Sequence, residues 1–183
     1  NYFEIIGGEN SSKHINYNIE NEELTIINNN KCEWLRNNDK RITVDLHFKN
    51  LRDLRNLGDG MIFSKDVVNF DTLSIHQNGT GNISLNLNAK RIWVDMYVVG
   101  DVELKGNSES LIALVGSFGN LKAKSLMSDW INVETIHEGD AYVYPLIGLN
   151  AVCEQIGDIY YYNKVDNPII KETKEGKVEF VEG

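Results

Sequence analysis

Aspartates recur in this sequence directly after a glycine and before a short apolar–polar–apolar run. Asp101, Asp140 and Asp158 occupy this position, and stacked carboxylates of this kind are one way to bind calcium. Calcium-binding β-rolls, however, use a Gly-Gly-x-Gly-x-Asp pattern at about half the spacing found here. Elsewhere the equivalent position holds Asn82, Asn120 and Lys177. Because too few carboxylates share the column, we expect no metal site.

The same motif has a simpler conformational interpretation. Glycine adopts the positive φ angle that a sharp corner can require, and a following Asn or Asp can hydrogen-bond its own backbone at a turn. We therefore interpret each Gly-Asp or Gly-Asn pair as a corner of the chain.

Few residues are spaced as acid–base catalysis would require. Polysaccharide-active β-helices gather carboxylates on one exterior face, whereas Glu103 and Glu179 are expected four rungs apart, about 19 Å, which is too far to share one bond. We expect Glu103 to pair with Lys122 on the next rung instead. The remaining candidates are predicted on turns: His76, Asp95, Glu134 and His137. We expect no catalytic residue and no enzymatic activity.

The two cysteines do not suggest a cofactor or a disulfide framework. Cys32 and Cys153 have no second cysteine or histidine at metal-ligand spacing. We expect isolated thiols, with Cys153 packed as a small apolar side chain, and no cofactor.

Aromatic side chains provide the best candidate for a binding site. Tyr142 and Tyr160 are expected on adjacent rungs, with Tyr162 and Tyr144 nearby, and stacked exposed aromatics can bind sugar rings or a protein partner. The alternative is that these tyrosines simply favour strands and cover their neighbours. On the other strand column, the outward apolar pair Trp93 and Ile112 suggests a contact between copies of the chain.

The elements that position these residues follow from an internal repeat. Its glycines are Gly81, Gly100, Gly119, Gly139, Gly157 and Gly176, separated by 19, 19, 20, 18 and 19 residues. Each copy contains two short segments in which apolar and polar residues alternate with period two. The second segment ends six residues before the next glycine. Such a unit cannot bury its own apolar face, but stacked copies can. The sequence therefore predicts an all-β fold, a single-stranded parallel β-helix with coils of about 19 residues.

Two columns of the repeat are predicted to point inward. The first contains Ile83, Val102, Leu121, Ala141, Ile159 and Val178, and the second contains Leu85, Leu104, Ala123, Val143, Tyr161 and Phe180. The residues between them must then face water, because successive side chains of a strand point to opposite sides.

Residues 1–70 keep the β pattern without the regular period. We expect them to form an irregular β section that starts and caps the solenoid formed by residues 71–183, within one continuous domain. The tract from Asn28 to Lys40 is rich in Asn and charged residues, which predicts an exposed hairpin or loop.

Charge and hydrophobicity exclude several classes of partner. A formal charge of −9 without a basic stripe disfavours nucleic acid and anionic membranes. No apolar run approaches the roughly 20 residues of a membrane-spanning helix, so we expect no transmembrane segment. The first residues, NYFEII, have the pattern of a strand already under way, so we expect that any export signal preceded them.

The repeat and its ending resemble the GIN-domain family, the putative auto-transporter adhesin head domain of bacterial cell-envelope proteins. The resemblance rests on the Gly-Asp/Asn-apolar corners and on GDIYYYNKVDNP, which is similar to a family ending of the form Gly-Asp-Ile-x-Tyr-x-Gly-x-Pro. Asn163 stands near the expected glycine, and VVGD and SFGN replace Gly-Ser-Gly corners. The resemblance implies a β-helix, export to the periplasm or cell surface, and an adhesive role, without known site residues.

Three functions are compatible with these observations. The favoured one is a noncatalytic surface module that binds a glycan or a cell-surface protein. The alternatives are an oligomerising scaffold similar to bactofilin filaments and, less favoured, a polysaccharide-active enzyme. The possible homo-oligomer would use Trp93 and Ile112, and the ligand would contact Tyr142, Tyr160 and Tyr162.

Overall fold

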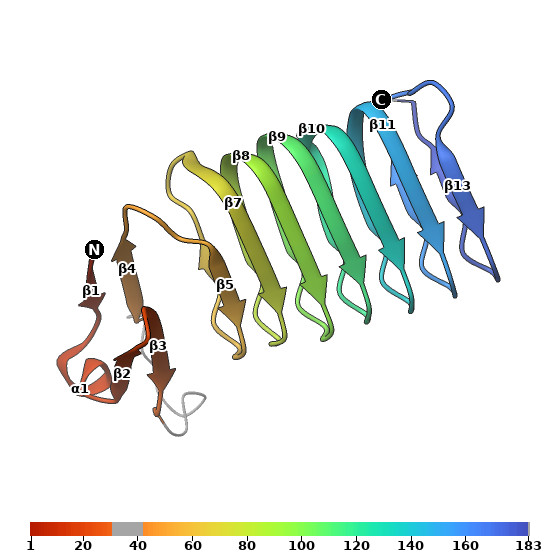
Figure 1. Ribbon diagram of the computed structural model, residues 1–183. Helices are drawn as coiled ribbons and strands as arrows, with labels where there is room; N and C mark the ends of the chain where they lie inside the picture. Colours follow the sequence, from red (N-terminus) through yellow and green to blue (C-terminus); the bar gives the residue numbers. More distant parts are fainter. Residues whose placement is uncertain (31–41, 183) are drawn as a thin grey trace. The chain divides into compact units, whose positions relative to one another are not determined.

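The computed structural model describes residues 1–30 and 42–182 of the chain (Figure 1). Cys32 and most of the tract from Asn28 to Lys40 lie outside the described residues. The chain divides into two compact units, Asn1–Lys49 and Asn50–Gly183.

The first unit contains two small antiparallel sheets. Its elements are β1 (Tyr2–Ile6), α1 (Glu9–Ser12), β2 (Ile15–Glu20), β3 (Glu23–Asn28) and β4 (Thr43–His47). β1 pairs with β4, and β2 pairs with β3 as a hairpin. The hairpin turn places Asn21 and Glu22 at φ angles of 50° and 66°, the left-handed conformation that a tight hairpin turn uses.

The second unit is a parallel β-solenoid of about seven turns. Its strands are β5 (Asp53–Asn56), β6 (Ile62–Phe63), β7 (Val68–Gln77), β8 (Ile83–Met96), β9 (Val102–Val115), β10 (Leu121–Thr135), β11 (Ala141–Cys153), β12 (Ile159–Tyr161), β13 (Ile169–Glu172) and β14 (Val178–Phe180). In Figure 1 the long strands β7 to β11 lie side by side, each shifted along the solenoid by one coil. The predicted fold class is confirmed.

The two strand segments of each coil are joined more closely than expected. In β8 to β11 they continue as single strands of 13 to 15 residues that bend in the middle. In β8 the bend shows as two successive exposed residues, Lys90 and Arg91, which interrupt the alternation of buried and exposed side chains. Pairing with the neighbouring coils continues on both sides of the bend, so the chain turns without leaving the sheet.

The core occupies the inside of the coils and confirms most of the two inward columns. Their members in β8 to β11 are all buried, as is Ile159 in β12. Phe180 differs from the prediction because its side chain is 43% exposed. It lies in β14, the terminal strand of the sheet, so no further coil covers it.

The corner glycines are required for a different reason from the one predicted. Among the described residues, Gly106 is the only glycine with a positive φ angle, 111°, and it lies within β9, paired with Leu87, rather than at a corner. At the corners, a Cβ atom on Gly139 would overlap the carbonyl oxygen of Gly119, and one on Gly157 would overlap that of Gly139. The prediction of positive φ is therefore wrong, and close approach of successive coils explains the repeated glycine.

Candidate functional site

The residues that follow the corner glycines form a ladder along the solenoid. The side-chain oxygen of one coil accepts a hydrogen bond from the backbone N–H of the equivalent residue in the next coil. The bonds run from Asp101 to Asn82 (3.0 Å), Asn120 to Asp101 (2.8 Å), Asp140 to Asn120 (3.0 Å), Asp158 to Asp140 (2.9 Å) and Lys177 to Asp158 (2.8 Å), donor first. The predicted bond to the residue's own backbone is therefore wrong, because this side chain links successive coils.

The contacts around the ladder also explain why this column can hold carboxylates. The second oxygen of Asp101 pairs with the Lys122 ammonium at 2.6 Å. The second oxygens of Asp140 and Asp158 accept hydrogen bonds from tyrosine hydroxyls, as described next. Both oxygens of each aspartate are thus engaged with the protein itself. Within the described part of the chain, no group of three or more His, Cys, Asp or Glu residues is arranged to hold a metal ion.

Tyr142 and Tyr160 form a stacked pair on adjacent coils. Their ring centroids are 5.2 Å apart and their planes differ by 16°. The Tyr142 hydroxyl donates to Asp140 at 3.2 Å, and the Tyr160 hydroxyl donates to Asp158 at 2.9 Å. The two strands β11 and β12 place these residues opposite each other, so sheet register and the aspartate ladder both fix the rings.

The aspartates also change the acidity of these phenols. The hydrogen bond to the Asp158 carboxylate raises the pKa of Tyr160 to about 12, because it stabilises the protonated phenol. Partial burial, followed by the negative charge of Asp140, raises the pKa of Tyr142 above its usual value. Both hydroxyls therefore remain protonated donors at neutral pH.

The other two tyrosines lie on the same side of the sheet. Lys124 places its ammonium group 5.9 Å from the ring centroid of Tyr162, within range of a cation–π interaction. Tyr144 is half-buried in β11 and is paired in register with Met127 of β10. In the Tyr142–Tyr160 pair, one face of each ring is turned to the other, and both residues are half-buried.

The charged residues of this face pair differently from the prediction. Glu103 accepts from the Ser84 hydroxyl at 2.8 Å and pairs with Lys105 at 2.9 Å. These two contacts, first that with Lys105, lower the pKa of Glu103. Lys122 pairs with Asp101 instead, so the predicted Glu103–Lys122 bridge is wrong.

Only one pair of the four acid–base candidates is brought together. His76 lies between two carboxylates, with Nδ1 3.3 Å from Asp95 and Nε2 3.3 Å from Asp53. Both ring nitrogens therefore face protein carboxylates, which belong to the strands β5 and β8 on either side of β7. Glu134 shares this column but lies three rungs away from His76, about 14 Å. His137 contacts the ring of Phe118 edge to face, with centroids 4.9 Å apart.

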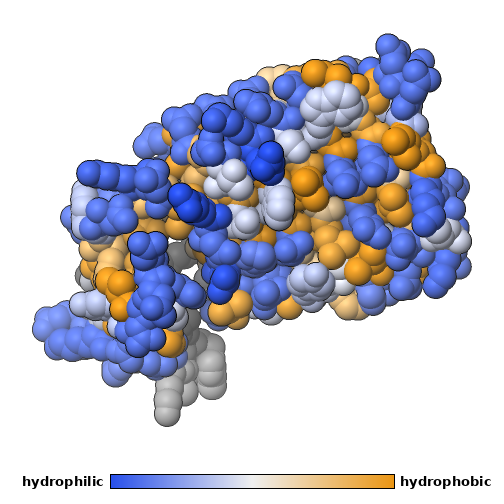
Figure 2. Space-filling view, in the orientation of Figure 1, coloured by the Kyte–Doolittle hydropathy of each residue, from blue (hydrophilic) through white to orange (hydrophobic). Residues whose placement is uncertain are grey.

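The predicted contact between copies lies on the second strand segment. Trp93 and Ile112 are paired in register and are 47% and 39% exposed. On the face of the solenoid seen in Figure 2, hydrophobic side chains lie among hydrophilic ones over the middle coils. The sequence thus identified an exposed apolar pair, although it is bordered by polar residues.

The sequence of the chain matches one protein family. The match covers residues 1–164, and the family is described as "Putative auto-transporter adhesin, head GIN domain". The chain belongs to this family. The predicted family is therefore confirmed. Residues beyond 164 lie outside the match, yet they continue the solenoid with β13 and β14. No curated protein matches the chain.

Solved structures with the same fold come from Bacteroides and Parabacteroides. A putative adhesin from Bacteroides fragilis shares 21% identity, with 98% of this chain and 82% of that chain covered and a TM-score of 0.85. A putative adhesin from Parabacteroides merdae shares 19% identity over 98% and 83% of the two chains, with a TM-score of 0.69. A putative lipid binding protein from Parabacteroides distasonis shares 18% identity over 99% and 84%, with a TM-score of 0.70. At these identities the likeness shows the GIN-domain fold.

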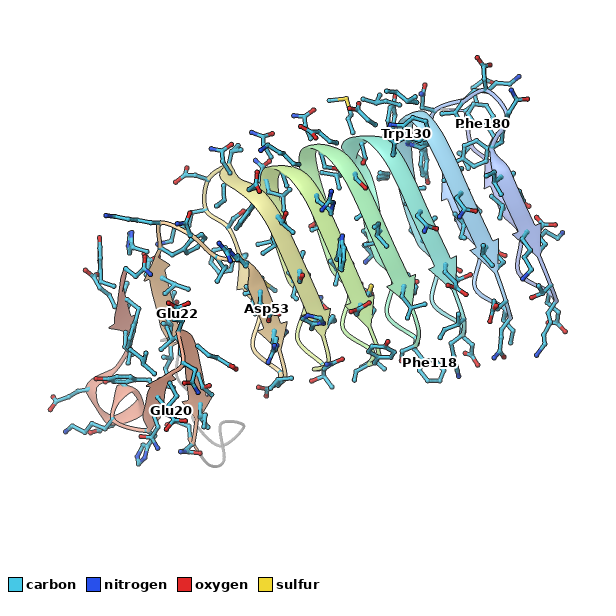
Figure 3. All side chains as sticks on the ribbon, viewed as in Figure 1. Glu20, Glu22, Asp53, Phe118, Trp130 and Phe180 are labelled. Atoms are coloured by element: carbon cyan, nitrogen blue, oxygen red, sulfur yellow. The ribbon has the colours of Figure 1, made fainter. Side chains whose placement is uncertain are left out.

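Sequence reasoning missed an exposed apolar group in this GIN-domain chain. It lies where β10 and β11 bend and consists of Met127, Trp130, Leu146 and Ile147. Figure 3 shows Trp130 at the upper edge of the solenoid, opposite the turn edge where Phe118 lies. The available signal was Gly148, a glycine outside the corner column, which is paired in register with Trp130.

The described helices contain no segment long and apolar enough to cross a membrane.

Cys153 is fully buried, and burial raises the pKa of its thiol, as expected for a packed small side chain.

Proposed function

We propose that this chain is a noncatalytic adhesive module that binds a glycan or a cell-surface protein through the tyrosine-bearing face of its solenoid. The stacked pair of Tyr142 and Tyr160, with both hydroxyls fixed by the aspartate ladder, carries the proposal. A partner meets these rings already ordered, so little side-chain entropy is lost on binding. Tyr162, held beside Lys124, extends the same contact surface.

The engagement of the acidic side chains supports a binding role over an enzymatic one. The ladder carboxylates are occupied by backbone amides, tyrosine hydroxyls and Lys122, and His76 is occupied by Asp53 and Asp95. General acid–base catalysis needs a group that can reach a substrate proton. These groups instead contact other groups of the protein, and in this proposal the chain acts without catalysis.

The proposed location is the periplasm or the cell surface of a bacterium. The family's description as an adhesin head domain supports this location, and the solved structures named adhesins come from bacteria. A rigid solenoid with a lateral contact face suits a module that holds a partner outside the cytoplasm.

The proposal is tested by a binding screen of the purified protein against glycans, envelope polysaccharides and cell-surface proteins. A Tyr142→Ala/Tyr160→Ala double variant should lose binding, whereas the Phe/Phe variant keeps the rings and should retain most of it. Tyr97→Ala removes an exposed tyrosine of the turn edge and serves as the matched control. Thermal unfolding confirms that each variant is folded. A wild-type protein that binds nothing in the screen would overturn the proposal.

A second candidate role is a scaffold of several copies in contact through Trp93 and Ile112. Their exposure on neighbouring strands favours it, since adjacent apolar side chains are often buried between subunits. Sedimentation velocity across a range of concentrations tests it. A Trp93→Ser/Ile112→Ser variant should shift the protein to monomer, and a wild-type protein that is monomeric throughout contradicts it.

A further inference from the structure

Two adjoining grooves cross the corner at which β7 to β11 bend. The larger one, about 430 Å³, is lined by residues of all five strands, including Asn69, Asn88, Asn107, Met127 and Leu146. The smaller one, about 300 Å³, shares Lys90 and Glu109 with it and also includes Trp130. Five strands span four rungs, so the larger groove extends about 19 Å along the solenoid. A lining that runs across five strands suits a linear ligand.

One wall of the larger groove is a ladder of asparagine amides. Asn88 donates to Asn69 at 3.1 Å, and Asn107 donates to Asn88 at 3.2 Å. An amide group has two N–H donors and a carbonyl oxygen with two lone pairs. Asn88 uses one N–H and one lone pair in the ladder and keeps one of each. The wall therefore combines fixed donors and acceptors, which hydroxyl and acetamido groups both match.

Trp130 provides an aromatic surface at the end of the smaller groove. Its six-membered ring lies against the main chain of Gly148 in the next coil, where an added Cβ atom would overlap the ring. The indole is thus fixed against the solenoid while the side chain remains 58% exposed. A fixed, half-exposed aromatic ring can pack against the apolar C–H face of a sugar.

Apolar side chains of β10 and β11 line part of the larger groove. Met127 and Leu146 line it and are 44% and 43% exposed. They offer a contact for methyl groups, such as that of an acetamido substituent. Polar and apolar groups of the lining thus match the two parts of an N-acetylated sugar.

The charges around the grooves are nearly balanced. The lining residues are Lys90 and Arg91 against Asp71, Glu109 and Asp129. Lys90 and Asp71 also form an ion pair. The corner lacks the positive field that would attract a polyanion. Its nearly balanced charge therefore favours an uncharged ligand.

A peptide added as an extra strand does not fit this place. β8, β9 and β10 are each paired on both sides, so their backbone amides are already used. Peptide recognition by strand addition requires a free sheet edge. The grooves must instead recognise a ligand through side chains.

From these observations we infer that the corner groove binds an uncharged linear glycan bearing acetamido groups, with one sugar ring on Trp130 and its polar groups on the Asn69–Asn88–Asn107 ladder. This inference rests on the proposed adhesive function and deepens it by naming a ligand class and a contact surface. Tyr144, paired in register with Met127, lies between this corner and the tyrosine pair, so a long glycan can contact both.

The test is isothermal titration calorimetry of the protein with chitohexaose, an uncharged hexamer of N-acetylglucosamine. Trp130→Ala should lower the affinity at least tenfold. Gly148→Ala keeps the indole but displaces it, and should also weaken binding. Tyr97→Ala, which removes an exposed aromatic ring outside the grooves, should leave the affinity unchanged. A hyaluronan hexasaccharide, which carries acetamido groups and carboxylates, should bind more weakly than chitohexaose.

The outcomes separate this inference from the proposed function. Equal affinity of the wild type and both Trp130→Ala and Gly148→Ala would overturn the groove, and loss in the tyrosine double variant alone would then support the adhesive role. A wild-type protein that binds other partners in the screen but not chitohexaose would overturn the ligand class only. A protein that binds neither would overturn both.

Discussion

At the scale of single residues, the aspartates of the repeat serve both stability and surface order. Asp158 accepts from the backbone of Lys177 with one oxygen and from the hydroxyl of Tyr160 with the other. A residue that first suggests calcium or catalysis therefore holds two coils and an aromatic ring in place. The column admits asparagine as well, because its amide oxygen accepts the same backbone hydrogen bond.

The Tyr160 phenol should titrate far above an ordinary tyrosine. Its pKa of about 12 in the folded protein exceeds the unfolded value of about 10, so the folded state holds the proton more tightly. The resulting stabilisation is complete below about pH 10 and is lost as the pH rises through 12. Spectrophotometric titration should show a late component among the eight tyrosines, which Tyr160→Phe removes. An identical titration curve for the variant would contradict this assignment.

At the scale of elements, the corner glycines test why the coils stack so closely. Gly139→Ala forces a Cβ atom onto the carbonyl oxygen of Gly119 and should destabilise the fold by about 1–3 kcal/mol. Gly60→Ala changes the same repeat position in the first coil, where no atom lies within 4 Å of the added Cβ. Its effect should stay within about 0.5 kcal/mol. Urea unfolding measures both, and equal losses would show that the contact with the preceding coil is not the cause.

The sequence predicts the inward columns well because two strong periods coincide there. Alternation along each strand and a repeat near 19 residues together place Val102, Leu121 and Ala141 in one buried line. The pairing of Trp130 with Gly148 was not predictable in this way. It depends on two register shifts in the β10–β11 pairing, between Ala123 and Met127 and between Ser128 and Trp130. A shift of one residue changes which side chains meet, and the alternation pattern does not report it.

The candidate site was predictable in part for the same reason. Tyr142 and Tyr160 follow their glycines by three residues, so a constant repeat places them on neighbouring rungs. Their hydrogen bonds to Asp140 and Asp158 depend on side-chain geometry at the corner, which a one-dimensional pattern does not contain. The grooves were missed because they lie at the strand bend, where exposed residues such as Lys90 and Arg91 break the alternation.

At the scale of the whole solenoid, the side chains on its lateral faces are better suited to recognition than its main-chain hydrogen-bonding groups. The middle strands are paired on both sides, and their side chains form continuous columns along the axis. The paired tyrosines and the asparagine amides recur at the rung distance of about 4.8 Å, so a linear partner can meet repeated groups. We therefore expect the solenoid to recognise a partner laterally, through fixed side chains.

The most direct measurement is an NMR map of the isotope-labelled protein titrated with chitohexaose. We expect shifts of the Trp130 indole N–H and of the side-chain amides of Asn88 and Asn107, with the Trp93 indole unchanged. Shifts centred on Trp93, or no shifts at saturating concentrations of the glycan, would contradict this expectation.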